Sequence, residues 1–131
     1  MKLKTKVYLS GGFKSGWQEI IINKLKDKFI FFNPRNHDLY NPDLYTAWDI
    51  HFVQECDIIF AFMENTNPSG YGLAFELGIA YAMNKTIILV DEKSIYDESF
   101  SRYFKILHRP SNVVFSNLDE GIEFLESFYI E

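Results

Sequence analysis

The feature that most constrains the fold of this chain is a regular alternation of short apolar runs with longer, helix-like segments. The apolar runs lie at 7–9, 29–32, 58–63, 86–90 and 112–115, and helical patterns occupy 15–28, 43–56, 71–84, 94–107 and 118–129. The runs are continuously apolar, which is typical of parallel strands covered on both faces. Strict alternation of strand and helix then predicts a doubly wound α/β arrangement. The stretch 92–111 is the least defined, and a helix or a loop would fit it.

The predicted fold class is a three-layer α/β sandwich with a five-stranded parallel sheet, flavodoxin-like or Rossmann-like. We expect one domain over residues 1–131, because this length supports a single core and no repeat or linker divides the chain. Apolar residues make up 47% of the sequence, with 13 Phe and 8 Tyr, which argues against disorder.

Charge and cysteine content limit the partners and the compartment. The net charge is −5 and no dense Lys/Arg cluster is present, so binding to a nucleic acid polymer is disfavoured. No apolar run reaches membrane-spanning length and no signal peptide precedes the first run. The single cysteine, Cys56, fits a reducing compartment. We therefore expect a cytoplasmic protein that does not bind membranes.

The candidate site follows from the predicted sheet, because doubly wound folds place ligands at the carboxyl ends of their strands. The residues in that position are Ser10, Gly11, Gly12 and Phe13, then Arg35 in the segment 33–35, then the segment 64–72 with Ser69, Gly70 and Gly72, and finally Asp91. Glycine, short polar groups and charge dominate this set, which suits a ligand site better than an ordinary solvated rim.

Two carboxylates interrupt otherwise apolar helical stripes. Asp49 falls in a stripe formed by Tyr45, Trp48, Phe52, Val53 and Cys56. Glu76 falls in one formed by Leu73, Leu77, Ala80 and Met83 or Asn84. Buried carboxylates need partners or a ligand cleft. Asp49 could instead accept from Trp48 or cap a loop, and Glu76 could cap its own helix through Ser69 or Asn67. Because both helices flank one strand end, a shared cleft is the favoured interpretation.

The placement of Glu76 suggests a chemistry. A strand, a glycine-rich turn and a helix start precede it, and we expect the helix N-terminus to favour its charged form. An ionised carboxylate in a partly dry pocket can attack the anomeric carbon of a sugar. Asp49 could then supply or relay a proton to the leaving group.

These residues carry a resemblance to a known family. The segments Val7-Tyr8-Leu9-Ser10-Gly11-Gly12-Phe13 and Gly72-Leu73-Ala74-Phe75-Glu76-Leu77-Gly78-Ile79-Ala80, together with Asp49, Asp57 and Lys85, resemble the nucleoside 2-deoxyribosyltransferases. The broader group includes the 2′-deoxynucleoside 5′-phosphate N-hydrolases. The resemblance covers about the first ninety residues, and its strongest element is the Gly-x-x-x-Glu-Leu-Gly-x-Ala core.

The resemblance implies roles for several positions. Glu76 matches the glutamate that forms the covalent deoxyribosyl intermediate, Asp49 an aspartate beside the base and leaving group, and Tyr8 a tyrosine that orients the glutamate. The loop residues Gly11, Gly12 and Phe13 match the lining of the base pocket. Tyr8 could also be an ordinary strand aromatic, and the two glycines could serve only the turn.

One position departs from the family pattern. The transferases often carry an aspartate six residues before the glutamate, where this chain has Gly70. A serine in this loop contacts phosphate in the monophosphate hydrolases, so Ser69 favours a phosphorylated ligand. Arg35 could add charge for phosphate or could only brace its loop. Trp48 could touch a base or could only pack.

The sequence thus predicts an enzyme that cleaves the N-glycosidic bond of a (2′-deoxy)nucleoside and passes the deoxyribosyl group to an acceptor base through Glu76. The alternatives are a 2′-deoxynucleoside 5′-monophosphate N-glycosidase, with water as acceptor, and a non-catalytic nucleotide-binding domain. The expected partners are a small nucleoside or nucleotide and a free nucleobase. No metal or organic cofactor is implied, and the resemblance implies a homo-oligomer.

Overall fold

The computed structural model describes residues 3–68 and 70–131 and contains one parallel sheet. Its five strands are β1 (Lys6–Gly11), β2 (Ile30–Phe32), β3 (Ile58–Met63), β4 (Thr86–Asp91) and β5 (Val113–Phe115). Their order in the sheet is β2-β1-β3-β4-β5, and every neighbouring pair is parallel. The predicted fold class is therefore confirmed.

Helices connect the strands. They are α1 (Trp17–Leu25), the 3-10 turn η1 (Pro34–Asn36), α2 (Pro42–Glu55), α3 (Tyr71–Ala82), α4 (Glu98–Tyr103), α5 (Lys105–His108) and α6 (Leu118–Glu126). The poorly defined stretch 92–111 forms two short helices rather than one, and Asp97 caps the first of them by accepting from the Phe100 amide. Within the described ranges, no helix combines the length and apolar character needed to cross a bilayer.

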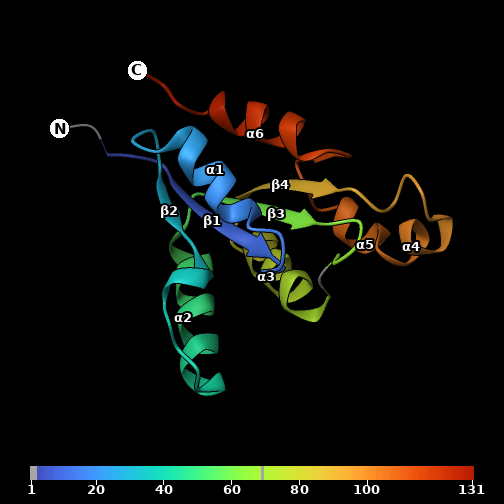
Figure 1. Cartoon of the computed structure of the whole chain (residues 1–131), viewed down its shortest axis with the longest axis horizontal. Coiled ribbons are helices and arrows are strands. Elements are labelled where there is room, and N and C mark those ends of the chain that lie inside the picture. The colour runs from blue at the N-terminus through green and yellow to red at the C-terminus, as the bar shows by residue number, and fades with distance from the viewer. Residues whose placement is uncertain (1–2, 69) are drawn as a thin grey trace.

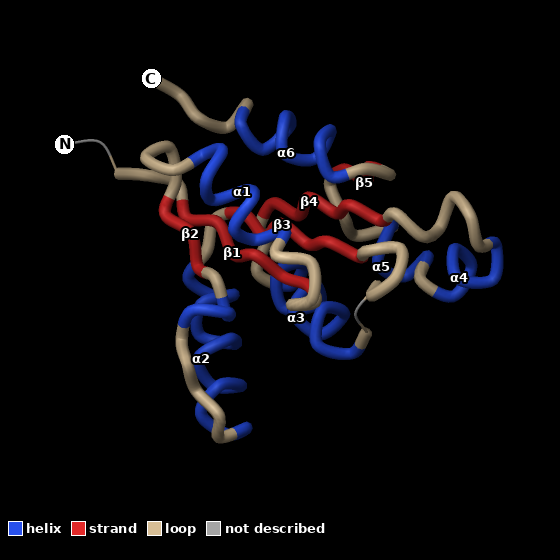
Figure 2. Tube along the Cα trace, viewed as in Figure 1, coloured by secondary structure: helices blue, strands red, loops and turns tan. Residues whose placement is uncertain are grey.

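Helices cover both faces of the sheet and make two cores (Figures 1 and 2). Helices α1 and α6 pack on one face around Trp17, Ile21 and Leu125. Helices α2, α3 and α5 pack on the other face, where their apolar side chains meet those of Ile59 and Ile87. The site described below lies at the second face, because it is built from β1, α2 and α3.

Strand β1 supplies residues to both cores by simple alternation. Val7 and Leu9 belong to the core under α1, whereas Tyr8 belongs to the core under α2 and α3. Since side chains alternate along a strand, Ser10 shares the face of Tyr8. Strand β1 lies between β2 and β3, so the chain order reverses beside it. That reversal is the point at which such folds open a crevice at the carboxyl ends of the strands.

The inward stripes of α2 and α3 are shorter than the sequence predicts. Helix α2 projects past the edge of the sheet (Figure 1), so Tyr45 is 37% exposed although it belongs to the predicted apolar stripe. Only the later part of that stripe, ending at Val53 and Cys56, is fully buried. In α3 the buried stripe ends at Ala80, and the following Met83 is 44% exposed.

Candidate active site

Glu76 on α3 is held by two hydroxyl groups from β1. Tyr8 Oη donates to Glu76 Oε2 over 2.7 Å, and Ser10 Oγ donates to Glu76 Oε1 over 2.7 Å. The two donors stand two residues apart on one face of the strand, which is why one carboxylate can meet both. Glu76 therefore does not use its oxygens to cap its own helix. The carboxylate is fixed in orientation while each oxygen keeps a further lone pair.

The environment keeps Glu76 close to its ionisation point at neutral pH. Burial raises the pKa of Glu76 from 4.5 to about 7, the hydrogen bonds from Ser10 and Tyr8 oppose the rise, and the charge of Asp49 adds to it. Burial and the adjacent Glu76 raise the pKa of the Tyr8 hydroxyl, so Tyr8 stays a donor.

This result corrects the expectation that the helix N-terminus favours the charged form of Glu76. Helix α3 begins at Tyr71, so Glu76 lies in its second turn. The field of a helix end fades within the first turn, and desolvation is the larger effect here.

Asp49 on α2 is the second carboxylate of the site. Its side chain is 25% exposed, and its Oδ1 atom is buried without a hydrogen-bond partner among the described residues. His37 Nε2 lies 3.6 Å from that atom, inside the range of an ion pair but longer than a hydrogen bond. Burial raises the pKa of Asp49, while a charge on His37 would lower it.

Both carboxylates line one cavity of ≈160 Å³. Its walls are Tyr8, Leu9, Ser10, Gly11, Phe13, Pro34, Asp49, Gly72, Leu73 and Glu76. The structure thus brings together seven of the residues that the sequence singled out. The volume is below the roughly 300–1,000 Å³ of typical ligand pockets, so this one chain encloses only part of a nucleoside-sized molecule.

Two glycines are closely packed where β1 ends and the following loop begins. Gly11 has φ +155°, and a Cβ there would lie 2.6 Å from the Phe62 carbonyl oxygen. A Cβ on Gly12 would lie 2.2 Å from Asn67 Nδ2. The Gly12 carbonyl accepts from Trp17 Nε1 at 2.8 Å. Gly12 therefore shapes the loop but does not line the cavity. Gly11 and Phe13 do line it.

Other predicted binding residues lie away from the cavity wall. The guanidinium of Arg35 contacts the Phe13 carbonyl oxygen and lies 3.5 Å from the Glu19 carboxylate, so it braces the β1–α1 loop. Trp48 packs on Phe52, with ring centroids 4.4 Å apart. Gly70 is the residue before α3 and is not part of the wall. Ser69 lies outside the described residues.

His37 is the residue of this site that sequence reasoning missed. Its spacing from the other histidines does not fit a metal pattern, and no other role was expected for it. The useful signal was its position shortly after β2, because that segment reaches the same edge of the sheet as Ser10.

Comparison with known proteins agrees with this geometry. Residues 4–94 match the model of the nucleoside 2-deoxyribosyltransferase-like family. No curated protein matched the sequence. Among solved structures, a 2-desoxiribosyltransferase from Leishmania mexicana has a TM-score of 0.74 at 16% identity, over 96% of this chain and 99% of its own. A conserved protein from Enterococcus faecalis V583 has a TM-score of 0.73 at 14% identity, over 95% and 99%.

A third solved structure is more similar in sequence. The CMP N-glycosidase BcmB from Clostridium botulinum has a TM-score of 0.64 at 26% identity, over 95% of this chain and 100% of its own. The fold and the paired carboxylates define an α/β enzyme of the transferase or N-glycoside hydrolase type. With the family model matched over more than half of its length, the chain belongs to the nucleoside 2-deoxyribosyltransferase-like family.

Proposed function

We propose that this enzyme cleaves the N-glycosidic bond of a (2′-deoxy)nucleoside and transfers the deoxyribosyl group to an acceptor base through a glycosyl ester on Glu76. The observation that carries the proposal is the pair of hydroxyl donors on Glu76, with Asp49 in the same cavity. Hydroxyl groups of a bound sugar could donate hydrogen bonds to the lone pairs that remain free on the Glu76 and Asp49 carboxylates. The whole chain, residues 1–131, would act as one domain.

The first step would start from the ionised form of Glu76. A lone pair of the carboxylate forms the bond to C1′ while the C1′–N bond breaks and its electron pair passes to the base. The pKa of about 7 leaves a large share of Glu76 ionised at neutral pH. Tyr8 and Ser10 hold the carboxylate in one orientation, which lowers the entropic part of the barrier.

The departing base needs a proton, and Asp49, which lines the same cavity as Glu76, is the group we propose as its source. Burial raises the pKa of Asp49, which increases the share of the acid form. In the second step the acceptor base attacks C1′, the ester bond breaks, and Glu76 is released as a carboxylate. Asp49 takes up the proton that the acceptor loses.

Hydrolysis of a 5′-monophosphate is the second candidate. The similarity to a CMP N-glycosidase at 26% identity favours it, and the first step would be the same. Water would then take the place of the acceptor base. The bracing contacts of Arg35 with Phe13 and Glu19 weaken its case as a free phosphate ligand.

The test is to incubate the protein with deoxynucleosides and their 5′-monophosphates, with and without a free acceptor base, and to follow bases by chromatography. Exchange that needs the acceptor supports transfer, and base release alone supports hydrolysis. Intact-mass spectrometry should detect a glycosyl adduct on the wild-type protein and none on Glu76→Ala. The matched control is Glu123→Gln, an exposed carboxylate of α6. Turnover by Glu76→Ala, or no turnover of any donor by the wild type, would contradict the proposal.

We also propose that two or more copies assemble around the α2–α3 face. Large apolar side chains are exposed there: Leu44 at 56%, Tyr71 at 94%, Phe75 at 60% and Tyr81 at 62%. Large exposed apolar side chains gathered on two neighbouring helices favour an interaction site. A second copy could also close the cavity, which is small for a nucleoside.

A further inference from the structure

The contacts of His37 fix which of its ring nitrogens carries the proton. The Leu39 amide donates to His37 Nδ1 over 3.0 Å. A backbone amide can only donate, so Nδ1 must carry a lone pair and the proton of the neutral ring is on Nε2. Nε2 faces Asp49 Oδ1 at 3.6 Å. The imidazole therefore presents an N–H group to the buried oxygen of Asp49.

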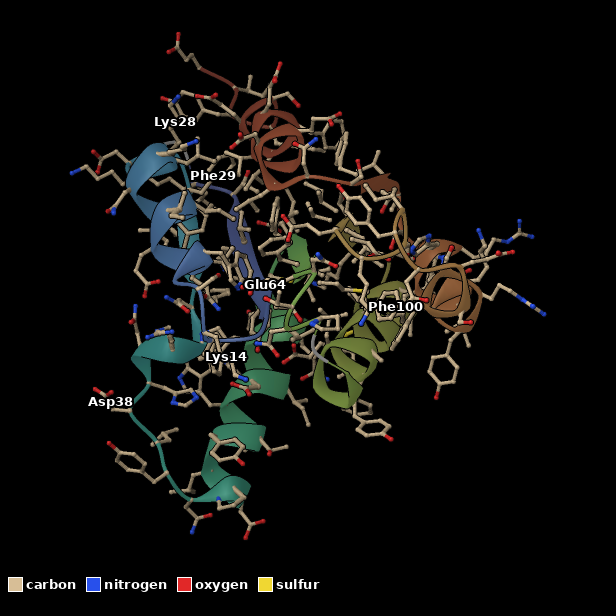
Figure 3. The ribbon with its side chains drawn as sticks, turned by 45° about the vertical axis from the view of Figure 1, so that its right-hand side comes forward. Lys14, Lys28, Phe29, Asp38, Glu64 and Phe100 are labelled. Atoms are coloured by element: carbon tan, nitrogen blue, oxygen red, sulfur yellow. The ribbon has the colours of Figure 1, made fainter. Side chains whose placement is uncertain are left out.

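The imidazole ring is held in place from several sides. It stacks on Tyr45 with the ring planes 4° apart, and it meets the edge of Trp48 with centroids 5.1 Å apart. The side chain is 13% exposed. Asn33 caps η1 before it and Asn41 caps α2 after it, so both ends of its loop are fixed. Figure 3 shows Asp38, the next residue, on the outer side of this loop.

Apart from His37, few groups lie near the Asp49 carboxylate. Among the described residues, its Oδ1 has no hydrogen bond, and the facing ionisable groups are His37 from the preceding loop, Tyr8 from β1 and Glu76 from α3. Tyr8 already donates to Glu76, so it is not available to Asp49. The Nε2–H of His37 is thus the donor placed to stabilise charge on Oδ1.

We propose that His37 is a positioning residue for Asp49, an inference that rests on the function proposed above. The Nε2–H group of His37 points at Oδ1, so the exchangeable proton of Asp49 resides on Oδ2, the oxygen that remains available to the substrate. When the C1′–N bond breaks, that proton moves to the base nitrogen that receives the electron pair. Asp49 becomes a carboxylate, and the Nε2–H group stabilises the new charge on Oδ1. The 3.6 Å separation closes to hydrogen-bond length as this charge develops.

The first experiment compares His37→Phe, His37→Gln and Asp49→Asn with the double variant His37→Phe/Asp49→Asn. His37→Phe keeps a ring for Tyr45 and Trp48 but removes the donor. We expect it to lower kcat about 10–100-fold, the usual effect of losing such a supporting partner, with KM nearly unchanged. His37→Gln, which carries an N–H group near the Nε2 position, should recover part of the loss. In the Asp49→Asn background, His37→Phe should cost nothing further.

The control is His51→Phe, at an exposed histidine of α2 whose ring centroid lies 4.7 Å from that of Phe52. It should leave kcat and its pH profile unchanged. A purely structural role for His37 would give equal losses in the wild-type and Asp49→Asn backgrounds and would change Tm more than kcat. Full kcat in His37→Phe, or additive losses in the double variant, would overturn the proposal while leaving the Glu76 chemistry intact.

The second experiment does not depend on turnover. Long-range ¹H–¹⁵N correlation spectra report which imidazole nitrogen is protonated. We expect the neutral ring of His37 to be the Nε2–H tautomer, and its signals to shift in Asp49→Asn but not in the exposed-site variant Asp43→Asn. Detection of the Nδ1–H form would overturn the inference even if the enzyme proved inactive with every donor.

Discussion

Replacing Glu76 by Gln should make the folded protein more stable above neutral pH. The pKa of Glu76 is about 7 in the folded chain and near 4.5 when the carboxyl is exposed, because burial penalises the charge. Between these values the folded state holds a proton that the unfolded state has lost. The free energy of unfolding contributed by this group therefore falls as pH rises from 4.5 to 7 and is constant above that.

The size of the effect follows from the two pKa values. A separation of 2.5 pH units corresponds to roughly 3 kcal/mol, at 1.36 kcal/mol for each unit. Glutamine removes the titration but keeps the shape, and its amide can accept from Tyr8 Oη while it donates to Ser10 Oγ. The variant should thus match the wild type near pH 4.5 and exceed it by up to about 3 kcal/mol at pH 8.

Urea unfolding followed by tryptophan fluorescence, at intervals from pH 4.5 to 8, measures this difference directly. For a slope of about 1–3 kcal/mol/M, the predicted gain moves the midpoint by about 1–3 M at pH 8. Other titrating groups are common to both proteins and cancel, and Glu123→Gln controls for the loss of one negative charge. Parallel pH curves for wild type and Glu76→Gln, or a gap that is widest at pH 4.5, would refute the reasoning.

Two further changes test the donors and the assembly. Tyr8→Phe removes a hydrogen bond to the ionised carboxylate of Glu76, worth about 1.5–3 kcal/mol. The rise of kcat with pH should therefore move up by about one to two pH units. The control Tyr129→Phe should leave the pH profile unmoved, and an unmoved profile in Tyr8→Phe would contradict the prediction. Phe75→Asp puts a charge on the exposed face of α3. It should convert the proposed oligomer to a monomer, as measured by sedimentation velocity, without lowering Tm. A wild-type protein that is monomeric at all concentrations would argue against assembly.

The fold was predictable because its signals are local. Continuous apolar runs predict buried parallel strands whatever surrounds them, and all five strands are found. The sequence could not show that two short helices, α4 and α5, divide at Phe104, because that residue is positioned by packing against Phe100 in the folded chain. The sequence predicted the bounds of helix α2 to within one residue, but the projection of this helix past the sheet is a property of the assembled layers.

The candidate site was predictable in part for a similar reason. Period-3.6 spacing placed Glu76 on the inward stripe of its helix, whereas the contact between Tyr8 and Glu76 was expected only from the family resemblance. The prediction for the ionisation of Glu76 was wrong, because the sequence shows a nearby helix start and does not show the extent of burial. His37 was missed because its approach to Asp49, twelve residues later, depends on the path of the loop between η1 and α2.

The geometry of the site is tied to the register of β1, which explains why the contacts of Glu76, the proposed nucleophile, and the packing of the core depend on one another. Ser10 pairs with Ala61 and Tyr8 with Ile59, so both donors face α3 while Val7 and Leu9 fill the opposite core. A slip of one residue would exchange these faces. It would bury the two hydroxyl groups under α1 and leave Glu76 unpartnered in an apolar setting, at a cost of a few kcal/mol. The register that pairs β1 correctly with the sheet is therefore the same one that lets Tyr8 and Ser10 hold the Glu76 carboxylate in one orientation.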